Sequence, residues 1–231
     1  MLSTFTTCRA IIKQSPHPLK GETYIKIEIA EKAKSVLSNR ESFHNYFAWP
    51  TVTRLHNGNL AAVASGYRLR HVCHFGKCVI SYSFNEGKSW TRPAPVIDTP
   101  LDDRDAGIAV SGNRVILTSF NNDVKMQRNR NNDKTQAYYH SKKESYVDAY
   151  LDKVTESDAE KKYLGSVYTV SEDGGETWQT DLIIHADEVD PDVGYPASVE
   201  LENGDILTVF YAHPEKGLPC EICQTVWRIT E

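Results

Sequence analysis

Short segments in which apolar and polar residues alternate make up most of the chain between residues 46 and 229. Such alternation is typical of half-buried β-strands. One pair of segments flanks Asn57-Gly58 and another flanks Asn203-Gly204. Because Asn-Gly between two alternating segments is the strongest short-range indication of a β-hairpin, the pattern predicts hairpins at both places.

The two hairpin regions are copies of one repeat. Residues 49–63 align with residues 195–209 without a gap, and a more diverged copy runs from Gly107 to Phe120 with its turn at Ser111-Gly112-Asn113. A further strand is predicted after each hairpin. In two cases it leads into a turn of the pattern S-x-D-x-G-x-[ST]-W, complete at 171–178 and weaker at 83–90. These copies indicate a repeat protein.

The residue types of the 171–178 turn have identifiable physical roles. Its Asp can hydrogen-bond nearby backbone groups, its glycine relieves a positive φ, and its Trp supplies a large apolar anchor where the next strand begins. The turn therefore predicts a hairpin corner and is silent on chemistry.

Four short strands in each repeated unit are typical of a β-propeller blade. We expect an all-β chain with three blades of four antiparallel strands, at about 46–97, 104–182 and 192–231. The predicted domains are an N-terminal segment, 1–45, and a propeller domain, 46–231.

The middle blade carries an insertion at 121–164. Apolar residues at helical spacing predict a helix over Ser141–Val154, and a capping box at Ser157-Asp158-Ala159-Glu160 predicts a short helix ending at Gly165. Residues 121–136 are polar and predict a surface loop. The insertion is expected to be a surface excursion over one face, with a substrate lid as the alternative.

Charge narrows the set of partners. The 231 residues carry a net charge of −5 and no long Lys/Arg run, which argues against nucleic acid or an anionic membrane as the main partner. No apolar stretch is long enough to span a bilayer, and residues 1–20 lack the apolar core of a secretory signal. The expectation from these features is a cytoplasmic protein.

Five cysteines, an odd number, favour free thiols over a disulfide framework. Cys220 and Cys223 have C-x-x-C spacing and could bind zinc together with Cys73 and Cys78. We expect buried thiols instead, because Cys78 and Cys223 fall within alternating apolar stretches. No metal and no cofactor are predicted.

The two turns, the Y-P-x-S-V-E-L-x-N-G hairpin that begins at Tyr195 and the segment Ser65-Gly66-Tyr67-Arg68 resemble the sialidase-like glycoside hydrolases with BNR (Asp-box) repeats. The resemblance covers residues 45–231. It implies a six-bladed propeller with an active site at the mouth of its central channel. It also implies an exo-acting hydrolase for terminal anionic sugars, sialic acid or related.

The resemblance assigns catalytic residues one position at a time. The family's acid/base Asp comes just before the second blade, and here Asp105 matches it, with Asp103 as second candidate. Carboxylates this close around an arginine can perturb one another's pKa. Tyr195 matches the nucleophilic tyrosine. The alternatives are an Asp-rich turn before a strand, and a core aromatic like Trp49 at the equivalent place in the first blade.

Substrate-binding residues follow in the same way. The family's first arginine, which would bind a carboxylate in bidentate fashion, is replaced by Ala48 in Phe47-Ala48-Trp49-Pro50. Arg68 and Arg104 remain as candidates for an anionic sugar, with a surface ion pair as the alternative for Arg68. His71 is a further candidate, and a His there would also suit a uronate polysaccharide lyase that abstracts a proton.

Three blades are half of the ring implied by the resemblance. Two unpaired blade faces then predict a homodimer that restores six blades. The rival to the hydrolase is a non-catalytic carbohydrate-binding or vestigial propeller fragment, which Ala48 and the missing blades favour.

Overall fold

The computed structural model describes residues 34–126, 128, 145–179, 182–185, 194–212 and 221–229. The chain divides into two compact units, Met1–Ser35 and Val36–Glu231. Every helix and strand below belongs to the second unit.

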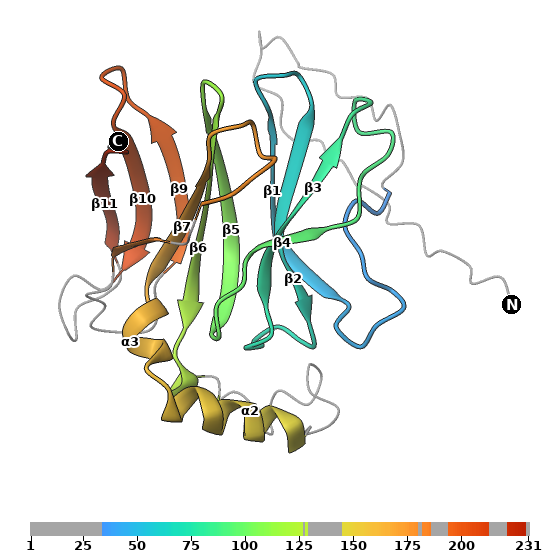
Figure 1. Cartoon of the computed structure of the whole chain (residues 1–231), viewed down its shortest axis with the longest axis vertical. Helices are drawn as coiled ribbons and strands as arrows, with labels where there is room; N and C mark the ends of the chain where they lie inside the picture. Colours follow the sequence, from blue (N-terminus) through green and yellow to red (C-terminus); the bar gives the residue numbers. More distant parts are fainter. Residues whose placement is uncertain are drawn as a thin grey trace, which may run out of the picture. The chain divides into compact units, whose positions relative to one another are not determined.

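The described strands form three antiparallel sheets, each joined in chain order (Figure 1). The first contains β1 (Tyr46–Arg54), β2 (Leu60–Arg68), β3 (Lys77–Ser83) and β4 (Ala94–Ile97). The second contains β5 (Asp102–Ser111), β6 (Arg114–Asn122), β7 (Ser166–Ser171) and β8 (Leu182–His185). The third contains β9 (Gly194–Glu200), β10 (Ile206–Ala212) and β11 (Glu221–Trp227).

The first strands of the three sheets are neighbours, because β5 contacts both β1 and β9 (Figure 1). The all-β prediction is confirmed. No described sheet closes on itself, and three strands of the third sheet are described where the repeat predicts four.

The predicted Asn-Gly hairpins have matching turns. Leu55 N donates to Asn59 O and Gly58 N to Leu55 O. Leu201 N and Gly204 N make the same two bonds in the other copy. Gly58 and Gly204 adopt φ values of 86° and 82°, a region that favours glycine. The sequence repeat is therefore also a repeat of backbone geometry.

The 171–178 turn is organised by Asp173. Its carboxylate accepts bonds from Ser171 Oγ at 2.6 Å and from Thr177 N at 2.9 Å. These bonds hold the pKa of Asp173 well below its usual range. In the weaker copy Asn85 Oδ1 accepts from Ser89 N at 2.9 Å, so an amide performs the same role.

Two apolar layers separate the three sheets. The layer between the first and second contains Ala61, Val63, Cys78, Ile80, Ala106, Val115, Leu117 and Val167. The layer between the second and third joins Ile116 and Val170 to Ile206, and Phe120 to Phe210. Gly107 lies in this second layer, where a Cβ would come within 2.5 Å of the Pro196 carbonyl oxygen. Only glycine allows β5 and β9 to approach so closely.

The helical insertion contains α2 (Ser145–Glu156) and α3 (Ala159–Tyr163), which lie at the end of the sheets where β6 ends (Figure 1). Apolar residues of α2 pack with Leu101, Val124 and the ring of Phe75. The predicted capping box is wrong, because Asp158 is the N-cap and makes no side-chain cap bond. Glu160 instead accepts a bond from Val124 N at 2.6 Å.

The predicted surface loop at 121–136 is also wrong at its start. Asn121 and Asn122 are buried residues of β6. Both amides donate inward, Asn121 to Tyr163 O at 2.7 Å and Asn122 to Asp102 Oδ2 at 3.1 Å. The sequence alone does not distinguish asparagine side chains that are buried and hydrogen-bonded from those exposed to solvent.

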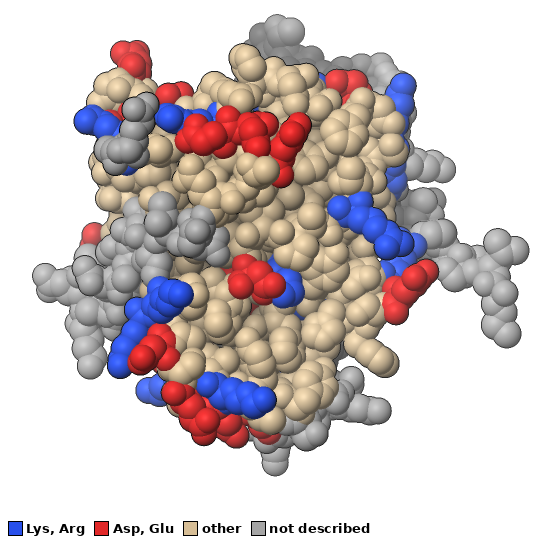
Figure 2. All heavy atoms as spheres, viewed as in Figure 1, with Lys and Arg blue, Asp and Glu red and all other residues tan. Residues whose placement is uncertain are grey.

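The cysteines are partly as predicted. Cys78 is fully buried, and Cys223 is half-buried. Cys8 and Cys220 lie outside the described residues. Within the described ranges, no cluster of His, Cys, Asp and Glu could hold a metal ion, and no helix is long and apolar enough to cross a membrane. Acidic and basic side chains are mixed on the face that Figure 2 shows.

Candidate functional site

Three non-glycine residues with positive φ occupy equivalent points of the first strand of each sheet. Trp49, Asp105 and Tyr195 have φ values of 54°, 55° and 51°. Each lies at an irregularity in the pairing of its strand, β1 with β2, β5 with β6 and β9 with β10. Such conformations cost about 1–3 kcal/mol each and cluster at functional sites. The three strained residues therefore mark a candidate site.

Asp105 is a buried carboxylate at one of these three strained positions. Its side chain is buried, and neither oxygen has a hydrogen-bond partner among the described residues. The nearest charge is Arg104, with Nε 3.7 Å from Oδ2. Burial raises the pKa of Asp105 to about 6, although the positive charge of Arg104 opposes the shift. A carboxyl group with this pKa can give or take a proton near neutral pH.

Asp103 is also buried, but its carboxylate accepts hydrogen bonds from neighbouring groups. Thr99 Oγ1 donates to its carboxylate at 2.8 Å, and Thr99 N and Asn121 also donate to it. Burial raises the pKa of Asp103 to about 7. Its oxygens are held by neighbouring backbone and side chains, so Asp103 has fewer open positions for a ligand than Asp105.

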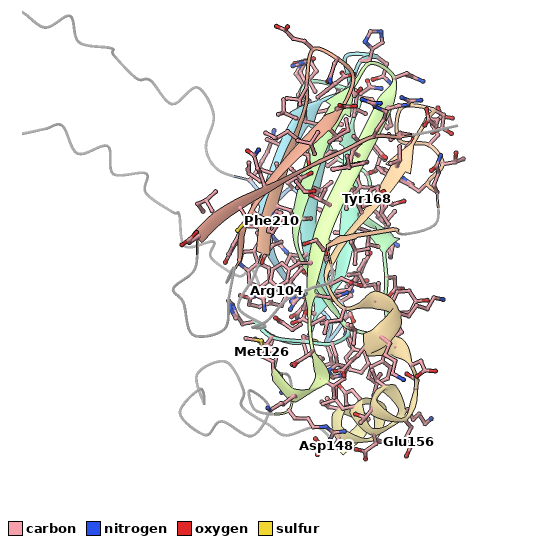
Figure 3. The ribbon with its side chains drawn as sticks, turned by 90° about the vertical axis from the view of Figure 1, so that its left-hand side faces the viewer. Arg104, Met126, Asp148, Glu156, Tyr168 and Phe210 are labelled. Carbon is pink, nitrogen blue, oxygen red and sulfur yellow. The ribbon has the colours of Figure 1, made fainter. Side chains whose placement is uncertain are left out.

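Arg104 lies between the site and the apolar core. Its guanidinium carbon is 4.4 Å from the centre of the Trp49 ring and 5.8 Å from that of Phe120. Its Nη1 is 3.7 Å from Asp102 Oδ2, and its Nε has no hydrogen-bond partner in the described part of the chain. Figure 3 shows Arg104 between Phe210 and Met126, toward the end of the sheets that carries the helices.

Arg68 is held by the protein through every N–H of its guanidinium. Nε donates to Arg70 O, Nη1 to Ser65 Oγ and Asp103 O, and Nη2 to His71 O and Asp102 Oδ1. The side chains of Arg68 and Asp102 are both fully buried. In this structure Arg68 braces the loop after β2 against the start of β5, and no guanidinium N–H remains for a ligand.

His71 borders the same cluster. Its Nδ1 is 3.3 Å from the hydroxyl of Tyr46, and its ring meets the Trp49 ring edge-on with centroids 4.9 Å apart. Either ring nitrogen could carry the proton. His71 and Tyr46 thus form a hydroxyl–imidazole pair beside Trp49.

The structure brings most of the sequence-predicted residues together. Arg68, His71, Asp103, Arg104 and Asp105 join one contact network through Asp102 and Trp49. Tyr195 lies on the neighbouring strand β9 at the equivalent backbone position, with a side chain that is 55% exposed.

Sequence reasoning missed two members of this network. Asp102, the shared partner of both arginines, was assigned no role from the sequence, and it is a residue of β5. The available signal was the mixture of acidic and basic residues directly before the apolar part of the strand, which could have indicated internal ion pairs. No sequence pattern indicated Tyr46, because its hydrogen bond with His71 depends on how the loop after β2 folds back.

No family model matches the sequence, and neither does any curated protein. Among solved structures, a Dyadobacter fermentans protein of unknown function has a TM-score of 0.53 and 20% identity, over 83% of this chain and 52% of that chain. The NanB sialidase of Streptococcus pneumoniae has a TM-score of 0.49 and 12% identity, over 86% and 47%. A GH93 α-L-arabinofuranosidase of Fusarium graminearum has a TM-score of 0.45 and 12% identity, over 83% and 49%.

These likenesses concern the fold alone. The chain shares its fold with the Dyadobacter protein and spans about half the length of each of these structures. Its structural neighbours at low identity thus include a sialidase and another glycoside hydrolase.

Proposed function

We propose that the chain is a sialidase-like, exo-acting glycoside hydrolase for terminal anionic sugars, and that its three sheets are blades of a β-propeller. One observation carries the proposal: Asp105 is buried beside Arg104, in a strained conformation, with no hydrogen bond to either oxygen among the described residues. An unsatisfied buried carboxylate is costly and calls for a functional explanation.

Each residue has a role that its chemistry suits. Arg104 would bind the sugar carboxylate, because a guanidinium offers planar, paired donors. Asp105, with a pKa of about 6, would transfer the proton to the leaving group. Tyr195, exposed on the neighbouring strand, would supply a hydroxyl nucleophile that does not repel the substrate's negative charge.

Turnover of aryl sialosides and uronic-acid glycosides tests the proposal. We expect Asp105→Asn and Tyr195→Phe to lower kcat by at least about a hundredfold. The matched controls are Asp98→Asn and Tyr146→Phe. Asp98 directly follows β4 and Tyr146 lies in α2, and both side chains are partly exposed. No turnover of any substrate by the unaltered protein, or equal losses in variants and controls, would end the hydrolase proposal.

A non-catalytic carbohydrate-binding role is the second candidate. Two observations favour it: Ala48 stands where the family has an arginine, and Arg68 has all of its N–H groups engaged. Saturable binding of a sugar without turnover, lost in Arg104→Met, would favour this role over the hydrolase.

A uronate lyase is the third candidate, and the Tyr46–His71 pair favours it. Either group could take the proton next to a uronate carboxylate in an elimination. Elimination leaves a carbon–carbon double bond in the product, whereas hydrolysis does not. Ultraviolet absorbance of the product therefore separates the two, and His71→Gln should abolish only the elimination.

A further inference from the structure

One tyrosine of α2 connects the helical insertion to both segments that hold the candidate site. The ring of Tyr150 stacks on that of His74, with centroids 4.9 Å apart and planes at 24°, and its centroid is 5.0 Å from that of the Phe75 ring. Its hydroxyl donates to the backbone oxygen of Pro100 at 3.2 Å. Tyr150 therefore contacts the β2–β3 loop, residues 69–76, and the chain directly before β5 at the same time.

The β2–β3 loop holds the charged side chains of the site. Two of its carbonyl oxygens accept from Nε and Nη2 of Arg68, at 3.3 and 2.8 Å. Its Cys73 N donates to Oδ2 of Asp102 at 3.2 Å, and the same oxygen lies 3.7 Å from Nη1 of Arg104. The loop also carries His71. A displacement of this loop would therefore move several groups that border the site.

The β2–β3 loop also shares an apolar cluster with the insertion. Its Leu69 and Phe75 pack against a cluster that contains Leu101, directly before β5, and buried residues of α2. The Phe75 ring also stacks on Tyr146 of α2, with centroids 5.9 Å apart, and His74 is only 4% exposed. Because aromatic pairs prefer defined relative orientations, such contacts fix the position of a loop as well as burying it.

We propose that Tyr150 is a positioning residue of the site, which holds the β2–β3 loop and the chain before β5 where Arg104 and His71 can meet a ligand. The inference rests on the proposed function, because it concerns the same site for an anionic sugar. Tyr150 acts through these two segments and is not itself a catalytic residue. Its ring holds the loop and its hydroxyl holds Pro100, so the two effects are separable.

Three variants separate them. Tyr150→Phe removes the hydroxyl bond and keeps the ring, whereas Tyr150→Leu removes both and keeps an apolar side chain in the cluster. Tyr163→Leu is the matched control, because Tyr163 is a partly buried tyrosine of α3 that packs against the same cluster. The ring contact described for Tyr163 is with Lys162 of its own helix, not with the loop.

Hydrogen–deuterium exchange of the full chain measures how firmly the loop is held. The Cys73 amide bonds to Asp102, and the Gly76 amide bonds to Cys73 O at 2.7 Å. Tyr150→Leu should speed exchange of both amides about tenfold, and Tyr150→Phe less than about threefold, with β10 unchanged. Tyr163→Leu should leave both amides unchanged. Unchanged exchange of both amides in Tyr150→Leu, or faster exchange throughout the chain, would overturn the proposal.

Titration of sialic acid and glucuronic acid adds a readout that a purely structural role would not move. Tyr150→Leu should weaken binding of the acid at least about tenfold, Tyr150→Phe should restore the affinity to within about threefold, and Tyr163→Leu should bind like the unaltered protein. An equal affinity in Tyr150→Leu and the unaltered protein would overturn the positioning role.

Failure of the proposed function gives a different result, in which the unaltered protein binds neither acid. The imidazole resonances of His71 then decide the role of Tyr150 together with the exchange rates. They should shift in Tyr150→Leu and stay in place in Tyr163→Leu. Resonances that stay in place in Tyr150→Leu would overturn the positioning role whether or not a sugar binds.

Discussion

Replacing Arg68 with Met removes the charge that holds the start of β5 to the end of β2. Met has a similar length and no donors. After the substitution Asp102 keeps hydrogen bonds from Cys73 N and Asn122, at 3.2 and 3.1 Å, and Arg104 Nη1 at 3.7 Å is its remaining cationic neighbour. It also strips a donor from Ser65 Oγ and from the backbone oxygen of Asp103.

The magnitude follows from burial. Both members of the Arg68–Asp102 pair are fully buried. Breaking a buried pair by removing one partner costs roughly 3–5 kcal/mol. We expect the lower part of that range, because Arg104 lies 3.7 Å from Asp102 and compensates part of the charge left behind. Single domains have only about 5–15 kcal/mol of stability in total. We therefore expect Arg68→Met to lose a large part of the free energy of unfolding.

Urea unfolding followed by tryptophan fluorescence measures the effect. The control is Arg54→Met, which removes the exposed Arg54–Glu86 pair and should change the free energy of unfolding little. The double variant Arg68→Met/Asp102→Leu should be more stable than Arg68→Met alone, because it also removes the buried carboxylate that has lost its closer cation. If the free energies of unfolding of Arg68→Met and the unaltered protein differed by less than about 1 kcal/mol, the bracing role of Arg68 would be refuted.

Three further predictions concern pH, close packing and a single hydrogen bond. The pKa of Asp105 is raised to about 6, so the folded chain holds this proton more tightly than the unfolded chain, where a pKa of about 3.9 is expected. Stability should therefore fall as pH rises from about 4 to 6, and Asp105→Asn should lessen that fall in urea titrations at both pH values. Gly107→Ala would place a Cβ 2.5 Å from the Pro196 carbonyl oxygen and should lower the thermal midpoint by several degrees, about 1–3 kcal/mol. Tyr82→Phe removes the 2.5 Å hydrogen bond from the hydroxyl to Gly175 O and should lower the free energy of unfolding in urea by about 1 kcal/mol; an unchanged free energy of unfolding would contradict this.

Sequence periodicity predicted the strands and hairpins well, because alternation and Asn-Gly turns are local signals. It placed the start of the second sheet too late. The repeat copy begins at Gly107 in the sequence, whereas burial beside the Arg68 and Arg104 guanidinium groups lets the carboxylates of Asp102 to Asp105 begin β5. The capping box failed for a similar reason, since Glu160 serves a distant backbone N–H.

The candidate site was predictable in part. Repeat equivalence identified Trp49 and Tyr195 as counterparts, and the structure adds that Asp105 is the third member, with the same positive φ. That conformation has no residue-type signature, because none of the three is glycine. The internal role of Arg68 was also beyond sequence, since it depends on loop carbonyls that only the fold brings together.

The central claim is that the site marked by the strained residues Trp49, Asp105 and Tyr195 binds a terminal anionic sugar through Arg104. Isothermal titration of sialic acid and glucuronic acid, with neutral galactose for comparison, tests it most directly. We predict saturable binding of at least one acid, no binding of galactose, and at least a tenfold loss of affinity in Arg104→Met with no such loss in Arg54→Met. Equal affinity in Arg104→Met and the unaltered protein, or no binding of either acid, would contradict the claim.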